Sequence, residues 1–173
     1  MGSSTVVIGN FDGVHPGHRE VLAEAKRRQP GLPLVVVTFW PHPVSVLRPG
    51  TEPMLLTSLE GRIELLTAAG ADRVEVIDFT PEFAAWSPSD FVEKVLSPLD
   101  PAVVVVGENF RFGKGASGSL DTLRELAAGR FDVDGLPLVR FGDEDTCSTR
   151  IRDALAAGDV THAAQHLGRL FCF

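Results

Sequence analysis

The stretch VVIGNFDGVHPGHREVLAEAKRR (residues 6–28) runs from a short apolar segment through a turn with glycine and histidine into a charged helical pattern. The valine-rich start is typical of a buried strand. Val21, Leu22 and Ala25 share one face of the following segment and charged residues occupy the other, which predicts a helix over 17–28. A strand leading directly into a helix is the first half of a βα unit, so the stretch favours an α/β fold.

The same alternation continues along the chain. Short valine-rich runs bounded by Gly, Pro or Asp predict strands at 5–9, 33–39, 73–79, 102–107 and 136–142. Helical patterns lie between or after them at 58–69, 87–99, 119–128, 149–157 and 158–168. Runs such as VVVV lack polar alternation, as expected for strands buried on both faces. We therefore predict a mostly parallel sheet with right-handed crossovers and helices on both faces.

Several helix ends carry recognisable capping residues. Ser58 and Ser87 are expected N-caps, and Ser87 is followed by Pro88 at the first helical position and by Asp90 three residues after the cap. Gly168 is expected to close the last helix. These signals place most helix boundaries without reference to any structure.

Composition narrows the class of protein. The chain has 173 residues, of which 44% are hydrophobic and 23% charged, as expected for one globular domain over 1–173. A net charge of −7 argues against a broad nucleic-acid surface. No apolar run approaches the roughly 20 residues of a membrane helix. Two cysteines without CxxC spacing indicate neither a metal motif nor a disulfide framework, so we expect a cytoplasmic protein.

Three polar clusters follow predicted strands or open predicted helices. They are GNFDGVHPGH (9–18), GENFRFGKGASG (107–118) and CSTRIR (147–152). In open α/β sheets, ligands bind beyond the carboxyl ends of the strands. The long Gly/Pro-rich stretches 40–57 and 107–118 are expected to be loops that carry function.

The first cluster combines glycines with two histidines at a strand–helix junction. Gly9, Gly13 and Gly17 allow tight turns and close approach of a ligand. A helix N-terminus exposes free N–H groups and a partial positive charge that attract phosphate. His15 and His18 can donate further hydrogen bonds to phosphate oxygens. The alternative is that both histidines only cap the helix, and the glycines at this junction favour phosphate binding.

The other two clusters are weaker when taken alone. Ser148 and Thr149 could simply cap a helix, and Arg150 and Arg152 point to different faces, so only one arginine should reach a ligand at the helix start. The glycine-rich 107–118 loop lacks the GK[ST] ending of a Walker A loop and has no GxGxxG pattern. Its alternatives are a flexible turn with aromatic anchors and a loop that closes over a planar or phosphorylated substrate.

Taken together, the motifs resemble the FMN adenylyltransferase module of bacterial bifunctional FAD synthetases, a family of HxGH nucleotidyltransferases. The resemblance runs in order through IGNFDGVHPGH, TFWPHP, LLT, GAD, FAAWSPSDFVEKVL, VVGENFRFG, CSTRIRDAL and GDVTHAAQHLGR. It implies a Rossmann-like nucleotidyltransferase fold and transfer of AMP from ATP to FMN, giving FAD and pyrophosphate with Mg²⁺. Such a transfer requires that the protein align two anions, the FMN phosphate and ATP, and it needs no protein nucleophile.

The resemblance also implies roles for individual residues. His15, His18 and Arg152 would be catalytic, with no metal ligands assigned to the protein. The nucleotide-binding set would be Gly9, Asn10, Phe11, Asp12, Gly17, His18, Gly107, Ser148, Thr149 and Arg152. The flavin or acceptor set would be His42, Pro43, Asn109, Phe110, Arg111 and Phe112. ATP and FMN are the expected partners, nucleic acid and membrane are not, and the oligomeric state stays open.

Some features depart from the family pattern. Trp40, Asn109 and Cys147 stand where members often carry other residues, and no riboflavin kinase module follows LGR, so no riboflavin phosphorylation is expected. One alternative is therefore a related nucleotidyltransferase, such as a cytidylyltransferase acting on another small phosphorylated acceptor. Another is a nucleotide- or flavin-binding module without turnover, which the intact histidine pair and STRIR segment disfavour.

Overall fold

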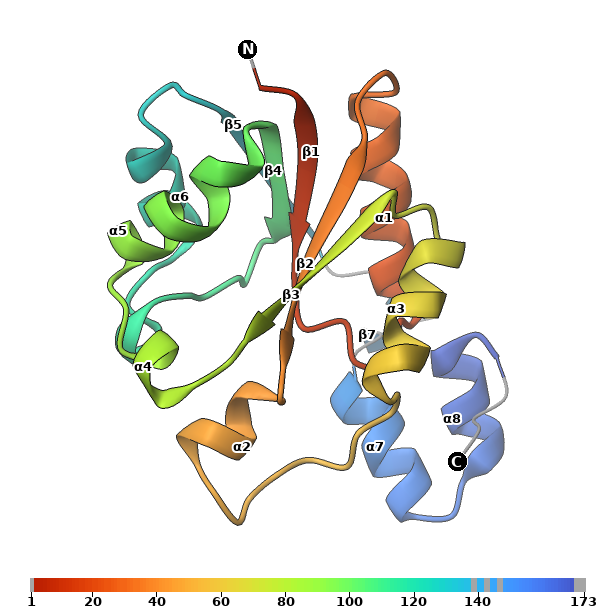
Figure 1. The fold of residues 1–173 in the computed structure, drawn as a ribbon. Helices are drawn as coiled ribbons and strands as arrows, with labels where there is room; N and C mark the ends of the chain where they lie inside the picture. Colours follow the sequence, from red (N-terminus) through yellow and green to blue (C-terminus); the bar gives the residue numbers. More distant parts are fainter. Residues whose placement is uncertain (1, 138–139, 142–143, 146–147, 170–173) are drawn as a thin grey trace.

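A five-stranded parallel sheet forms the centre of the molecule (Figure 1). The computed structural model describes residues 2–137, 140–141, 144–145 and 148–169. The strands are β1 (Ser4–Ile8), β2 (Leu34–Trp40), β3 (Arg73–Asp78), β4 (Pro101–Gly107) and β5 (Asp132–Leu136). They pair in the order β3-β2-β1-β4-β5, and every neighbouring pair is parallel. The predicted parallel α/β fold is confirmed.

Helices cover both faces of this sheet. On one face lie α1 (Pro16–Arg28) and α3 (Leu59–Ala68). On the other lie α6 (Leu120–Ala127) and α5 (Pro88–Phe91), which continues into a π-helical turn (Val92–Leu96) and a 3₁₀ turn (Ser97–Leu99). Successive β1 residues alternate between the two cores, since Val6 packs with Phe91 and Leu123 whereas Val7 packs with Leu22. The valine runs are thus buried on both faces, as predicted.

The remaining elements gather around the carboxyl ends of the strands (Figure 1). They are α2 (Pro43–Leu47), α4 (Pro81–Ala84), a 3₁₀ turn (Lys114–Ala116), the two-stranded β6 (Arg140–Phe141) and β7 (Glu144–Asp145), α7 (Ser148–Ala156) and α8 (Val160–Leu167). The last two helices pack through a small apolar cluster that includes Ile151, Leu167 and Leu56. Among the described residues, no helix combines the length and apolar character needed to cross a bilayer.

Two sequence predictions about elements are wrong. The fifth sheet strand is Asp132–Leu136, whereas the sequence predicted it at 136–142, of which 138–139 and 142 lie outside the described residues. This edge strand is partly exposed, and its sequence DVDGL has polar residues between the apolar ones. It therefore lacks the apolar run by which the other strands were predicted. Gly135 also brings it close to α6, since a Cβ there would lie 2.5 Å from Leu120 Cδ2. The 40–57 stretch, expected to be irregular, contains α2.

The predicted helix caps are confirmed. Ser58 Oγ accepts from Gly61 N at 3.0 Å, and Ser87 and Asp90 form a reciprocal capping box. Gly168 ends α8 in the left-handed region, with φ of 76°. These local signals fix where the covering helices begin and end.

The strand order creates one position where a ligand site is expected. The chain moves from β1 outward through β2 to β3, and then returns to place β4 on the opposite side of β1. At this switch point the loops that follow β1 and β4 diverge and leave a crevice between them. The first and second polar clusters are those loops.

Candidate active site

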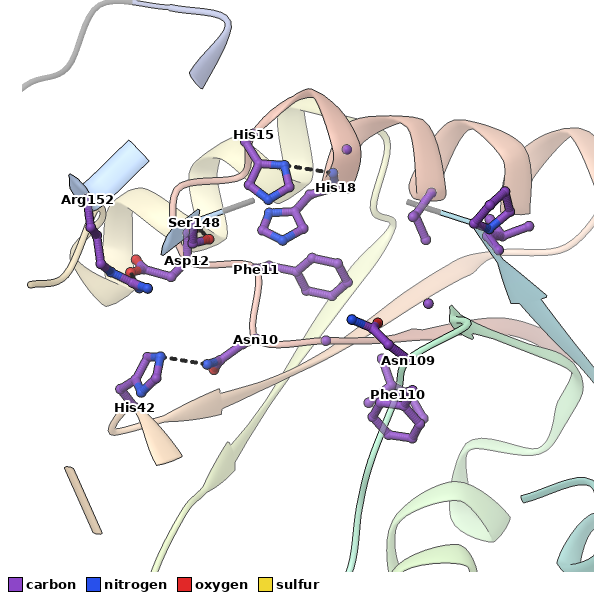
Figure 2. A pocket seen from close by; sticks show the side chains of 17 residues that line it. Asn10, Phe11, Asp12, His15, His18, His42, Asn109, Phe110, Ser148 and Arg152 are labelled. Atoms are coloured by element: carbon purple, nitrogen blue, oxygen red, sulfur yellow. Dashed lines mark hydrogen bonds and ion pairs between the residues drawn. The ribbon is translucent and has the colours of Figure 1, made fainter. Parts of the chain in front are cut away.

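A cleft of about 340 Å³ opens at the switch point (Figure 2). Its volume lies in the range of small-molecule sites. Most predicted site residues line it: Gly9, Asn10, Phe11, Asp12, His15, Gly17, His18, His42, Gly107, Asn109, Phe110, Ser148 and Arg152. Thr149 is exposed on α7 outside this lining, and so is Arg150, which agrees with the expectation that a single arginine faces the site. Three clusters far apart in sequence therefore meet in one cleft.

The two histidines form a stacked pair at the N-terminus of α1. Their ring centroids lie 3.6 Å apart, and His15 Nδ1 accepts from His18 N at 3.4 Å as the N-cap. The Phe11 ring meets the His18 ring edge-on at 5.0 Å. His15 thus caps the helix and lines the cleft at the same time, so the two sequence interpretations do not exclude each other.

Both histidines are held neutral near pH 7. Burial lowers the pKa of His15 to about 4, and the positive charges of Arg19 and Arg169 act in the same direction. Burial also lowers the pKa of His18, with further contributions from His15 and Arg62. Neutral imidazoles still donate one N–H each. Together with the positive end of the α1 dipole, they give the cleft an anion-attracting wall without a permanent charge on the rings.

Asp12 is a structural centre of the site. Its carboxylate is buried and accepts from the backbone N–H groups of Leu56 at 3.0 Å and Thr57 at 3.1 Å. Arg152 from α7 pairs with the same carboxylate (Figure 2). The sequence assigned Asp12 to nucleotide binding; in this structure the side chain joins the β1–α1 turn to the 54–57 segment and to α7.

Arg62 is a site residue that the sequence analysis did not identify. It lies in α3, is fully buried, and places Nη2 3.5 Å from Asp12 Oδ1. Its Nη1 donates to Thr38 Oγ1 at 3.3 Å and to the Phe39 carbonyl at 3.1 Å. An arginine in an otherwise apolar helix face is the only signal that could have indicated it, because its partners lie in other parts of the sequence.

The turn after β1 adopts an unusual backbone conformation. Phe11 and Val14 have φ of 53° and 43°, and Gly13 has φ of 89°. A positive φ is rare for a β-branched residue such as Val14 and indicates local strain. Ser148 Oγ donates to the Asp12 carbonyl at 2.7 Å, and Arg169 donates to the carbonyls of Gly13 and Val14. Side chains from the end of the chain therefore hold the turn.

His42 joins the other end of the cleft to the same turn. His42 Nδ1 accepts from Val44 N at 3.2 Å to cap α2, and His42 Nε2 lies 2.9 Å from the side-chain amide of Asn10 (Figure 2). Thr38 Oγ1 donates to the Asn10 carbonyl at 2.8 Å. Burial, followed by the charge of Arg152, lowers the pKa of His42.

Comparison with known proteins identifies the family. A family model described as FAD synthetase matches residues 2–150. The chain belongs to the FAD synthetase family. It is 36% identical over 169 residues to the bifunctional riboflavin kinase/FMN adenylyltransferase of Listeria monocytogenes, and 35% and 33% identical to those of Bacillus subtilis and Escherichia coli K12. Each match covers 96% of this chain and 54% of the relative, so the chain spans about half the length of these curated relatives.

Solved structures support the same fold. A Streptococcus pneumoniae protein described as a macrolide-efflux protein superposes with a TM-score of 0.87 at 29% identity, over 97% of this chain and 56% of that one. Pantoate-beta-alanine ligase from Francisella tularensis superposes with a TM-score of 0.58 at 14% identity, over 95% and 78%. The second likeness concerns the fold alone.

An aromatic cavity of about 430 Å³ adjoins the cleft in this FAD synthetase family member. It lies where the loops after β2, β3 and β4 meet, and its aromatic lining is Phe39, Phe79, Phe83, Trp86, Phe91, Phe110 and Phe112. Pro43 and Arg111, predicted for the acceptor site, line it as well. Phe110 lines both the cleft and the cavity and stacks on Phe112 with centroids 5.4 Å apart.

Proposed function

We propose that this domain transfers AMP from ATP to the phosphate of FMN, forming FAD and pyrophosphate. The observation that carries the proposal is the pairing of two cavities through Phe110. One is a cleft with neutral histidines at a helix N-terminus, and the other is a large aromatic cavity. Membership of the FAD synthetase family supports the same reaction.

The cleft has the chemistry of a triphosphate site. The N-terminus of α1 and the rings of His15 and His18 face it from one side, and Arg152 and Ser148 face it from α7. Such donors stabilise the charge that develops on a transferring phosphoryl group because they are already oriented in a partly buried site. We assign to His18 and His15 the oxygens of the α-phosphate and the leaving pyrophosphate, and to Arg152 the outer phosphates.

The aromatic cavity suits the planar ring system of a flavin. Phe79 and Phe83 meet edge-on at 5.4 Å, and Phe83 and Trp86 lie 4.9 Å apart, so aromatic faces and edges surround the space. Aromatic rings stabilise one another in such arrangements beyond simple burial. An isoalloxazine held here would extend its ribityl phosphate past Phe110 toward the cleft.

The reaction then needs no covalent intermediate with the protein. An FMN phosphate oxygen attacks the α-phosphorus of ATP, the bond from that phosphorus to the bridging oxygen breaks, and the electron pair leaves on pyrophosphate. The protein contributes positioning and donors, which supply most of the catalysis in phosphoryl-type transfer.

The family resemblance implies Mg²⁺, and the donor set fits an ion carried by the nucleotide. Asp12 is already occupied by amides and arginines, and the Asn10 amide is within hydrogen-bond distance of His42 Nε2. We therefore assign no protein oxygen to Mg²⁺, which the phosphates of the nucleotide would hold. The ion would neutralise phosphate charge when bound.

The decisive experiment incubates the protein with FMN, ATP and Mg²⁺ and measures FAD and pyrophosphate by chromatography. Formation of both in equal amounts supports the proposal, and their absence refutes it. The same assay with each nucleoside triphosphate tests the alternative acceptor. Pyrophosphate release with CTP and another phosphorylated compound, together with indifference to FMN, would replace the proposed reaction with that of a different nucleotidyltransferase.

A further inference from the structure

Arg62 is a fully buried arginine whose guanidinium is only partly hydrogen-bonded. Its side chain has no exposed surface, and its Nε and Nη2 atoms have no hydrogen-bond partner within the described ranges. The guanidinium also lies 5.4 Å from the centre of the Trp40 ring. Buried guanidinium groups are normally saturated with hydrogen bonds, because an unsatisfied buried charge is destabilising.

The nearest negative charge is one that Arg62 shares. The Asp12 carboxylate lies 3.5 Å from Arg62 Nη2 and forms a closer pair with Arg152. One carboxylate thus pairs with two guanidinium groups, and these three side chains carry a net positive charge at the cleft wall. Asp12 forms its closer ion pair with Arg152, and the Arg62 guanidinium lies beside the same carboxylate at a longer distance.

The two arginines differ in what they can reach. Arg152 lines the cleft and is partly exposed, and its Nε donates to the Met54 carbonyl at 2.7 Å. Arg62 stays behind Asp12, where Thr38 and Phe39 fix one edge of its guanidinium. Of the two, Arg152 is the one that can turn toward an anion in the cleft, and a turn that aims its guanidinium at the phosphates weakens its pair with Asp12.

We propose that Arg62 is a positioning residue that takes over the Asp12 carboxylate when nucleotide phosphates draw Arg152 into the cleft. The inference rests on nucleotide binding as proposed above. With Arg62 present, Asp12 keeps a cation at all times, so releasing Arg152 costs little. Without Arg62, the buried carboxylate would retain only its amide and hydroxyl donors, and Asp12 would therefore hold Arg152 back from the ligand.

This role predicts that Arg62→Met affects binding as well as stability. Removing one partner of a buried ion pair is destabilising, although Asp12 keeps Arg152 beside it in this variant. Arg62→Met should therefore stay folded with a lower melting temperature, and its folded fraction should bind nucleotide more weakly. A purely structural arginine would lose stability and leave the affinity of the folded fraction unchanged.

The experiment measures binding of α,β-methylene-ATP with Mg²⁺ by calorimetry and melting by circular dichroism. We expect Arg62→Met to weaken binding about tenfold to a hundredfold, the scale of leaving a buried charged group unpaired. Arg62→Lys keeps the charge and should recover most of the affinity. The control Arg124→Met changes an exposed arginine on α6 that pairs with Asp121, and it should bind as wild type.

Each outcome decides something. Equal affinity of wild type and Arg62→Met, or failure of Arg62→Met to fold, overturns the role of Arg62. Equal losses in the Lys and Met variants also overturn it, because charge would then not matter. A wild-type protein that binds the analogue but forms no FAD refutes the proposed acceptor and leaves the Arg62 result valid. A wild-type protein that does not bind the analogue refutes both.

Discussion

At the scale of single residues, the histidine pair works as a neutral donor pair at the start of a helix. Two imidazolium rings 3.6 Å apart beside a helix N-terminus would repel each other and the helix dipole. Burial removes that conflict by lowering the pKa of both rings. Arg152, which is anchored by Asp12 and the Met54 carbonyl, then supplies the permanent positive charge of the cleft.

The lowered pKa of His15 predicts a pH-dependent stability. The folded pKa of about 4 lies below the ordinary 6.5, so the unfolded state binds more protons between these values and stability falls as pH falls through that window. The shift corresponds to about 3 kcal/mol lost between pH 6.5 and 4. His15→Asn keeps a capping acceptor but cannot titrate, so its urea-unfolding free energy should fall less steeply. Parallel curves for both proteins would contradict this.

His18 is expected to matter for turnover more than for folding. His18→Ala removes a donor that faces the cleft, and losing one such donor typically reduces kcat about a hundredfold to a thousandfold. Rates of FAD formation and melting curves of the variant and the wild type test this. A variant that is folded and retains a near wild-type rate would show that His18 does not stabilise the transferred group.

At the scale of elements, the β1–α1 turn owes its shape to helices that come much later in the chain. The positive φ angles of Phe11 and Val14 persist because Ser148 of α7 and Arg169 after α8 bind the carbonyls of Asp12, Gly13 and Val14. The turn in turn sets the position of the histidine pair. The α7–α8 pair is thus part of the site although most of its residues do not line the cleft.

Removing the Arg169 contacts should loosen this turn. Arg169→Ala loses hydrogen bonds from a charged donor, each worth about 1.5–3 kcal/mol, so we expect kcat/KM to fall at least about tenfold. It also removes a positive charge that lowers the pKa of His15 and His18, so the acid limb of the pH profile should move to higher pH. Arg169→Lys should restore the limb and part of the rate.

A matched control separates this effect from general loss of an arginine. Arg130 lies on the opposite side of the sheet, where it donates to Glu93 and to backbone carbonyls of α6. Arg130→Ala should leave kcat/KM and the pH profile unchanged. If the Arg169 and Arg130 variants behave alike, the turn does not depend on Arg169.

The elements could be predicted wherever the signal is local. The valine runs of β1, β2 and β4 and the capping residues Ser58 and Ser87 act within a few positions of the structure that they determine. The edge strand Asp132–Leu136 was misplaced because half-exposed edge strands need no apolar run. Within the site, the sequence brought three clusters together but assigned no structural role to Asp12 and did not identify Arg62, since their pairing is set by tertiary contacts.

At the scale of the whole molecule, the sheet places two cavities of different chemistry along one edge. The cleft at β1 and β4 is lined by polar groups and a helix N-terminus, whereas the cavity beyond β2 and β3 is lined by aromatic rings. Two unlike substrates could therefore occupy neighbouring sites whose reacting ends face each other. This arrangement predicts that a substitution in one site changes the binding of its own substrate and leaves the binding of the other substrate unchanged.

Phe79 tests that separation. It lines the aromatic cavity alone and packs edge-on against Phe39 at 6.0 Å. Phe79→Ala should raise the KM for FMN about tenfold, the upper end of an aromatic contact, and leave the KM for ATP unchanged. Steady-state kinetics with each substrate varied in turn measures both values. An equal rise for both substrates would mean that the cavity does not hold the flavin.

Phe110 belongs to both cavities, and thermodynamics attaches a consequence to that position. A ligand that orders the Phe110 ring in one cavity orders a wall of the other, so the second ligand no longer bears that entropy loss. If the two ligands are FMN and ATP as proposed, linkage requires reciprocity: FMN should tighten ATP binding by the same factor by which ATP tightens FMN binding. The shared side chain thus couples the two sites, and one coupling free energy describes the effect of each ligand on the affinity for the other.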